Sequence, residues 1–223
     1  MIEPLRNWAD RYRSRGKYTP VGVAFHWIMA AMIITQLLSG WYMQRLTVGA
    51  DKLSAYAFHS QLGLAVLLLG GGRLVWRLMV PGPINDADAP GAASTIAHMI
   101  HAVFYALFVV LPLSGWALWS AVQPSQQLYL LGFIPIPNMP FQDFSPEMAE
   151  WAMGIAMNIH VACVVVMTLL VPAHALAAIK HHFWDRDDVL EGMLPEVPDT
   201  HSHPGGPRYS PPAPAIPRPP KAG

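Results

Sequence analysis

The sequence predicts an all-α membrane protein, a bundle of four transmembrane helices. Of its 223 residues, 53% are hydrophobic and only 13% are charged, whereas a typical soluble domain has roughly 25% charged residues. A bilayer-spanning helix needs about 20 mostly apolar residues, and four such stretches lie at 21–43, 56–80, 96–121 and 151–179. A soluble core of four such helices would need more polar chain to cover it, and the stretches lack the alternation of membrane β-strands.

The four spans contain few ionisable side chains, and apart from tyrosines and Cys163 these are all histidine or arginine. They are His26 in the first span, His59, Arg73 and Arg77 in the second, His98 and His101 in the third, and His160 and His174 in the fourth. Ionisable groups are expensive within a bilayer and mark functional sites there. These residues are therefore the first candidates for function.

Three regions follow from the composition. Residues 1–20 form a basic leader, 21–194 the four-helix domain, and 195–223 a proline-rich tail, in which ten of 29 residues are proline. Such a tail cannot form a core, so we expect it to be disordered. Its His201 and His203 are read as an incidental solvated pair rather than a metal site. Between the third and fourth spans, residues 122–150 are long enough for a short helix or a lid.

The positive charges predict the orientation. With the N-terminus inside, twelve of the 14 Lys and Arg residues fall on the inner side and only Arg45 and Lys52 on the outer side. Because basic residues are enriched in cytoplasmic segments, both termini are expected to be cytoplasmic. A cleaved signal peptide is not expected, because the first apolar run is too long and no A-x-A site follows it.

Composition also excludes some partners and cofactors. The formal net charge is zero, which argues against nucleic-acid binding, since that requires an excess of basic residues. Cys163 is the single cysteine. A single cysteine rules out an internal disulfide, a four-cysteine zinc site and the C-x-x-C-H attachment of a c-type haem.

Four histidines fall into two pairs by depth. His160 and His174 are 14 residues apart, about four helical turns, so both lie on one helix face about 21 Å apart. His26 in the first span matches the depth of His174, and His59 in the second span matches that of His160. Two imidazole pairs on facing helices, one per leaflet, are the arrangement that would clamp two flat macrocycles.

The macrocycle that fits is a non-covalent b-type haem. A porphyrin supplies four nitrogens and two imidazoles complete the iron shell, whereas zinc would need four protein ligands. Gly40, Gly63 and Gly115 would leave room for a flat ring near the ligands. Two alternatives remain open: each histidine could bond a serine or a backbone carbonyl, or the histidines could relay protons, although no Asp or Glu lies within the spans.

Further residues are candidates for the surroundings of the haems. Arg73 is 14 residues beyond His59 and is predicted on the ligand face at the depth of the inner haem, where it could pair with a propionate or anchor the helix. Arg77 could do the same. His101 and His98 could bond propionates or line a quinone site, but rank below His26 and His174 as ligands. We expect His181, His182 and Trp184 to lie at the inner membrane interface, past the end of the fourth span.

Several motifs resemble the bacterial di-haem cytochrome b561 family, over about residues 18–195. They are Phe25-His26-Trp27, His59-Ser60-Gln61-Leu62-Gly63, Arg73-Leu74-Val75-Trp76-Arg77, Ala97-His98-Met99-Ile100-His101, Leu111-Pro112-Leu113-Ser114-Gly115-Trp116, His181-His182-Phe183-Trp184-Asp185-Arg186-Asp187 and Met193-Leu194-Pro195. The resemblance implies a four-helix bundle in the bacterial inner membrane. It also implies two b haems per chain, with His26, His59, His160 and His174 as ligands.

The resemblance implies electron transfer between the periplasmic side and a membrane quinone such as ubiquinone. Some similar proteins oxidise superoxide and reduce ubiquinone, while others anchor a periplasmic redox partner. Superoxide is an anion, yet the outer segments carry two positive residues against four negative ones: Arg45 and Lys52 against Asp51, Asp143, Glu147 and Glu150. This balance weakens the superoxide reading, so both functions stay open, as does a haem-free structural or proton-relay bundle. The expected relay runs from the outer haem to the inner one, roughly 20 Å away.

Overall fold

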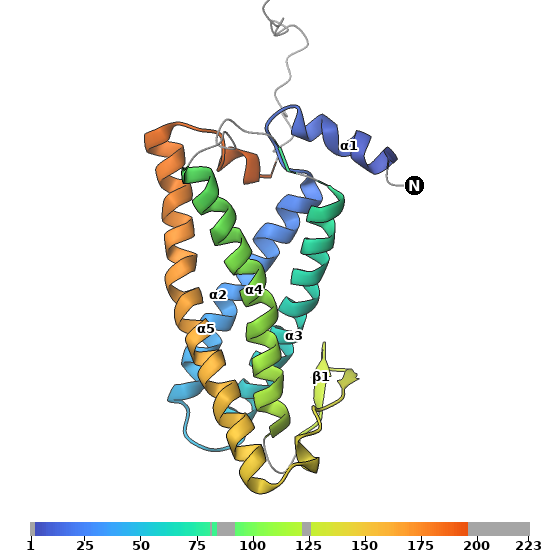
Figure 1. Cartoon of the computed structure of the whole chain (residues 1–223), viewed down its shortest axis with the longest axis vertical. Coiled ribbons are helices and arrows are strands. Elements are labelled where there is room, and N and C mark those ends of the chain that lie inside the picture. The colour runs from blue at the N-terminus through green and yellow to red at the C-terminus, as the bar shows by residue number, and fades with distance from the viewer. Residues whose placement is uncertain (1–2, 81, 84–91, 122–125, 196–223) are drawn as a thin grey trace, which may run out of the picture.

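A computed structural model describes residues 3–80, 82–83, 92–121 and 126–195 of the chain. Four helices in this part are long and apolar enough to cross a membrane, which confirms the predicted fold class. They are α2 (Pro20–Arg45), α3 (Ala50–Met79), α4 (Ala92–Ala121) and α5 (Pro146–Lys180), and they run side by side as a bundle (Figure 1). The expected disorder after 195 and the histidine pair there lie outside the described residues.

The first and last of these helices begin in the same way. Thr19 precedes Pro20 and accepts a hydrogen bond from the backbone N–H of Gly22. Ser145 precedes Pro146 and accepts one from Met148. A hydroxyl cap followed by proline at the first helical position satisfies amide groups that have no partner within the helix. Both helix starts are therefore determined by the local sequence. The apolar stretch alone predicts that the fourth span begins at 151, five residues after the start of α5.

The bundle is apolar on its outside as well as in its centre. Leu38, Leu68 and Leu169 are 61%, 61% and 69% exposed although they lie within spanning helices. A soluble monomer rarely exposes so much contiguous apolar surface, so lipid covers these faces. A smaller core of buried residues lies at mid-bundle: Met29, Ile33, Val66, Leu107, Phe108 and Met167.

Both ends of the described chain lie at one end of the bundle, which we call the termini end (Figure 1). There the predicted basic leader contains a helix, α1 (Glu3–Arg13), which the sequence reading did not anticipate. Its Trp8 packs edge-on against Trp76 of α3, with ring centroids 6.4 Å apart. The chain after α5 forms a π-helical turn, η3 (His181–Asp185), and a 3₁₀ turn, η4 (Glu191–Met193). The indole N–H of Trp27 donates to the carbonyl of Met193 at 2.7 Å and ties this segment to α2.

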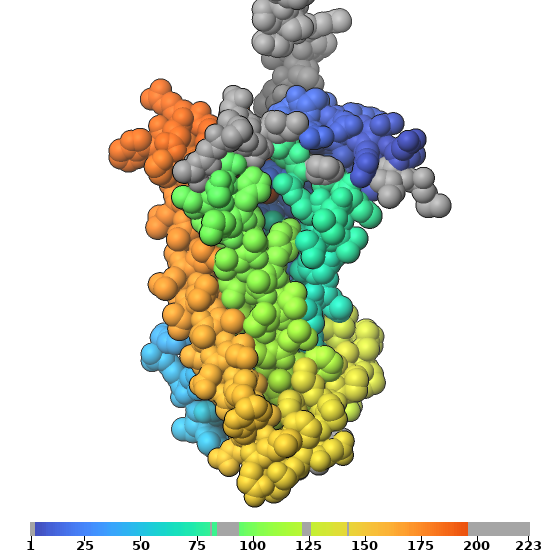
Figure 2. Space-filling model, in the orientation of Figure 1, coloured from blue at the N-terminus to red at the C-terminus, as the bar shows by residue number. Residues whose placement is uncertain are grey.

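The opposite end, the far end, is covered by the segment between α4 and α5 (Figure 2). This segment forms an antiparallel hairpin of β1 (Leu128–Leu130) and β2 (Ile134–Ile136), followed by the 3₁₀ turn η2 (Phe141–Asp143). The segment, expected to form a short helix or a lid, is thus mainly a hairpin, whose alternating side chains bury Leu128 and Leu130 in a cluster with Leu64 and Trp119. The indole N–H of Trp119 also donates to the carbonyl of Gln126 at 2.9 Å.

Candidate functional site

One histidine pair lies toward the far end. His59 of α3 and His160 of α5 face each other across the bundle, with ring centroids 6.3 Å apart and ring planes at 69°. Both side chains are half-buried. We call these two residues the far pair. The depth matching of the sequence reading had placed these residues at the same level, and the structure brings their rings together.

A serine hydroxyl lies within hydrogen-bond distance of one ring nitrogen of each histidine in the far pair. Ser39 Oγ of α2 lies 2.9 Å from His59 Nδ1, and Ser114 Oγ of α4 lies 2.9 Å from His160 Nδ1. Each serine hydroxyl already donates to a backbone carbonyl three residues earlier, at 3.0 and 2.9 Å. A hydroxyl that donates to a carbonyl can still accept, so each serine oxygen is placed to accept the Nδ1–H proton. This tautomer would leave Nε2 of each imidazole with a free lone pair, the state that binds a metal.

A glycine follows each of these serines and lies against the same imidazole. A Cβ atom on Gly40 would lie 3.2 Å from Cε1 of His59, and one on Gly115 would lie 3.3 Å from Cε1 of His160. Any side chain there would crowd the rings. The sequence predicts room for a ring at these two glycines and also at Gly63, where a Cβ would instead lie 3.0 Å from Nε2 of Gln36. It allows that a histidine could bond a serine, but by itself it assigns neither Ser39 nor Ser114 to a histidine. A signal was available, because Leu-Ser-Gly-Trp occurs twice, at 38–41 and 113–116.

The second pair lies toward the termini end. His26 of α2 and His174 of α5 have ring centroids 6.2 Å apart and ring planes at 50°, and both are half-buried. We call these the near pair. Arg73 Nη2 of α3 lies 3.2 Å from His26 Nδ1. Because a guanidinium only donates hydrogen bonds, His26 Nδ1 accepts here and the proton lies on Nε2. Binding of a metal through Nε2 would require Arg73 to release His26.

A third imidazole accompanies the near pair. The His101 ring lies 5.7 Å from the His174 ring, and its Nδ1 donates to the carbonyl of Ala97 at 2.7 Å. His98 makes the same contact one turn earlier, with the carbonyl of Ser94 at 2.7 Å. Both side chains are exposed. The Arg77 guanidinium lies 5.6 Å from the ring centroid of Tyr18, which is consistent with an anchoring role.

The two pairs fit the coordination shell of a haem iron. Two imidazoles that bind one metal ion from opposite sides, each through a nitrogen at about 2 Å, have ring centroids about 6 Å apart. The far and near pairs have 6.3 and 6.2 Å. Neutral imidazoles are also the donors that such an iron takes. The apolar mid-bundle core lies between the two levels, with Phe104 of its rim 5.3 Å from His174.

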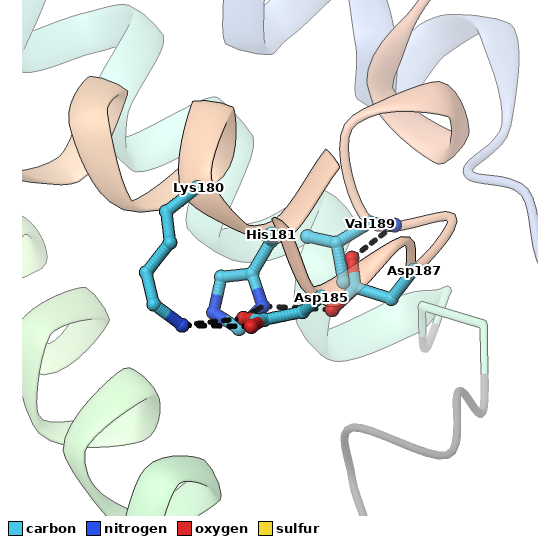
Figure 3. Close-up of polar contacts among 5 residues, drawn as sticks. All are labelled: Lys180, His181, Asp185, Asp187 and Val189. Atoms are coloured by element: carbon cyan, nitrogen blue, oxygen red, sulfur yellow. Dashed lines mark hydrogen bonds and ion pairs between the residues drawn. The ribbon is translucent and has the colours of Figure 1, made fainter. Parts of the chain in front are cut away.

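A further polar cluster follows α5 (Figure 3). His181 Nδ1 lies 2.7 Å from an oxygen of Asp187 and 3.1 Å from one of Asp185. Lys180 Nζ contacts both oxygens of Asp185, at 2.6 and 2.9 Å. The three possible ligand atoms of His181, Asp185 and Asp187 lie within 4.8 Å of one another. The ammonium already neutralises Asp185, so the contacts account for the cluster as an ion-paired end of the helix. Next to it, Trp184 is 83% exposed.

Comparison with known proteins gives one family. A model described as "Prokaryotic cytochrome b561" matches residues 17–196. Among curated relatives, "Cytochrome b561 homolog 2" of Escherichia coli is 24% identical over 184 residues, 80% of this chain and 91% of that protein. "Cytochrome b561 homolog 1" of Escherichia coli is 25% identical over 80% of this chain and 97% of its own length. "Probable superoxide oxidase CybB" of Yersinia pestis is 26% identical over 81% and 97%.

Proposed function

Because the chain belongs to the prokaryotic cytochrome b561 family, we propose that it carries electrons between the far end of the bundle and a membrane quinone through two b haems. Membership itself implies membrane electron transfer with b-type haem in a multi-pass inner-membrane protein. The count of two haems, their ligands and the two end points of transfer belong to the proposal. The observation that carries it is the equal spacing of the far and near pairs, 6.3 and 6.2 Å.

His59 and His160 would hold one haem, and His26 and His174 the other. A haem held by these residues would supply reversible one-electron chemistry. The 14 residues between His160 and His174 separate the two levels by about 21 Å along α5. Ser39 and Ser114 keep the Nδ1 protons of the far pair in place, which fixes the ring orientation and leaves Nε2 free.

The proposal places the termini in the cytoplasm. Four spans put both described chain ends on one side of the membrane. That end carries the Arg residues of α1 and Arg73 and Arg77 of α3, whereas only Arg45 and Lys52 flank the opposite ends of α2 and α3. Basic residues favour the cytoplasmic side. The far pair would then serve a periplasmic donor and the near pair the quinone.

The donor that we propose first is superoxide, with ubiquinone as acceptor. One relative, 26% identical, is named a probable superoxide oxidase. A second candidate is an anchor that exchanges electrons with a periplasmic redox protein. It is favoured by the acidic surface of the far end, where exposed Asp51, Asp143, Glu147 and Glu150 outnumber Arg45 and Lys52. An acidic face suits a basic protein better than it suits a small anion.

A haem count tests the cofactor proposal. The full chain is purified in mild detergent, and its pyridine haemochrome spectrum is measured against polypeptide concentration. We expect two b haems per chain, and one in each of His59→Ala, His160→Ala and His174→Ala. His98→Ala, an exposed histidine of α4, is the matched control and should keep two. A colourless wild-type protein would overturn the proposal and favour a haem-free structural or proton-relay bundle.

Quinone reduction separates the two donors. The purified chain in liposomes with ubiquinone receives superoxide from an enzymatic generator, with superoxide dismutase as the control. Superoxide-dependent reduction of ubiquinone by the chain alone would support the oxidase. Haem-loaded protein that reduces no quinone alone, but does so with a co-purifying periplasmic redox protein, would support the anchor.

A further inference from the structure

The two halves of the bundle repeat each other at most of the site positions. His26, Ser39, Gly40 and Trp41 of α2 recur 75 positions later in α4, as His101, Ser114, Gly115 and Trp116. His59 of α3 recurs 101 positions later in α5 as His160, whereas the position equivalent to Arg73 is occupied by His174. Each helix pair, α2–α3 and α4–α5, therefore carries the same pattern. No repeat is identified from the sequence alone, because apart from the two Leu-Ser-Gly-Trp segments only single, widely spaced positions match.

The contacts repeat along with the residues. The serine–imidazole distance is 2.9 Å in both halves. The distance from a glycine Cβ to the imidazole Nδ1 would be 3.7 Å in both. Core residues correspond as well: Ile33 and Phe108, and Val66 and Met167, are buried equivalents. An approximate twofold relation between the two helix pairs therefore holds in space.

Under this relation His101 is the counterpart of His26. The far pair consists of two equivalent residues, His59 and His160, so the far site follows the twofold relation. The near end breaks it, because Arg73 occupies the position equivalent to His174 and a guanidinium cannot bind a metal. His174 therefore has two potential partner histidines, which occupy equivalent positions in the two helix pairs. The ring centroid of His174 lies 6.2 Å from that of His26 and 5.7 Å from that of His101.

The hydrogen bonds of the two candidates differ in a way that matters for binding a metal. His26 Nδ1 accepts from Arg73, so its Nε2 carries the proton. His101 Nδ1 donates to the Ala97 carbonyl, so its Nε2 keeps a free lone pair. A backbone carbonyl on the second nitrogen is the usual arrangement of a metal-binding imidazole. His101 is thus already in the tautomer that can bind a metal through Nε2. His26 can adopt this tautomer only when its hydrogen bond from Arg73 is broken.

We propose that His101 is a second axial-ligand position of the near site, and that it binds the near haem in place of His26 when His26 is absent or held by Arg73. The inference rests on the proposed function, since it concerns the same haem. It gives the near end, where quinone would react, a choice of ligand that the far end lacks among the described residues.

Haem content in combined variants tests this inference. His26→Ala is expected to retain two haems per chain, with an altered low-spin electron paramagnetic resonance signal for one of them. His26→Ala with His101→Ala is expected to retain one. His26→Ala with His98→Ala is the matched control, because His98 also donates Nδ1 to a carbonyl four residues back, and it should behave like His26→Ala alone.

The outcomes separate the inference from the function. If His26→Ala holds one haem, with the signal of the far haem unchanged, the protein is folded and His101 does not substitute, which overturns the inference alone. If the wild type holds two haems and only the double variant with His101→Ala loses one, the inference stands. A wild type without haem overturns the proposed function.

Discussion

The far pair and the near pair have nearly equal ring spacing but different surroundings. At the far pair each Nδ1 donates to a serine hydroxyl, and each ring lies against a glycine. At the near pair one ring accepts from Arg73, and a third imidazole, His101, lies 5.7 Å from His174. The spacing of the two imidazoles therefore determines which group a site can bind. The hydrogen-bond partners of the imidazole Nδ1 atoms determine whether the rings are held in one orientation. We therefore expect the far site to hold one ligand arrangement and the near site to allow more than one.

The largest effect should come from removing a ligand at the fixed site. His59→Ala or His160→Ala leaves a single imidazole there, so we expect complete loss of one haem per chain, measured by pyridine haemochrome. Imidazole added to the buffer should restore part of it, because the vacated space accepts a small ligand. Retention of both haems in either variant would remove the distinction between the two ends.

Next in size is crowding of the far pair. Gly40→Ala or Gly115→Ala places a Cβ within 3.3 Å of a ring carbon, and such overpacking costs about 1 to 3 kcal/mol. We expect weaker binding of the far haem in a haem-transfer titration. Gly71→Ala and Gly154→Ala are matched controls on α3 and α5, where a new Cβ meets nothing within 4 Å. Equal effects at all four glycines would point to helix propensity instead.

The charge beside the near pair should set its potential. Arg73→Gln removes a cation next to His26. At an effective dielectric constant of about 20 and a separation of about 8 Å, its influence on the iron is about 2 kcal/mol, roughly 90 mV for one electron. The reduced haem is favoured by a nearby cation, so we expect the potential of the near haem to fall in a spectroelectrochemical titration. Arg77→Gln, one turn further, is the control and should change it less. A fall confined to the far haem would contradict the assignment.

The smallest effect should come from the serines. Ser39→Ala or Ser114→Ala leaves an Nδ1–H without its acceptor, a loss of about 1 kcal/mol. A less basic imidazole stabilises oxidised iron less, so the potential of the far haem should rise while that of the near haem stays unchanged. Thr35→Val, which removes a hydroxyl bonded only to the Ala31 carbonyl of its own helix, is the control. A change in haem content without a change in potential would assign the serines a packing role.

Helical periodicity was sufficient to predict the levels of the histidines. The rise and angle per residue are constant along a helix, so His160 and His174 had to share a face, and the apolar lengths had to be spans. The same reasoning placed Arg73 beside the near pair, where it contacts His26. Periodicity could not predict α1 or the hairpin at 128–136, because short amphipathic and three-residue segments take their structure from what they pack against.

The sequence by itself determined the membrane class, the four spans, the depth of each histidine and the glycines that leave the rings room. Only the tertiary structure decided which hydroxyl, guanidinium or carbonyl meets the second nitrogen of each ring. Those contacts depend on how far each helix is rotated and how closely it approaches its neighbour, which is set by side-chain packing across the bundle. Leu-Ser-Gly-Trp occurs twice in the sequence, at 38–41 and 113–116, but only the structure shows that Ser39–His59 and Ser114–His160 are the same contact in the two halves.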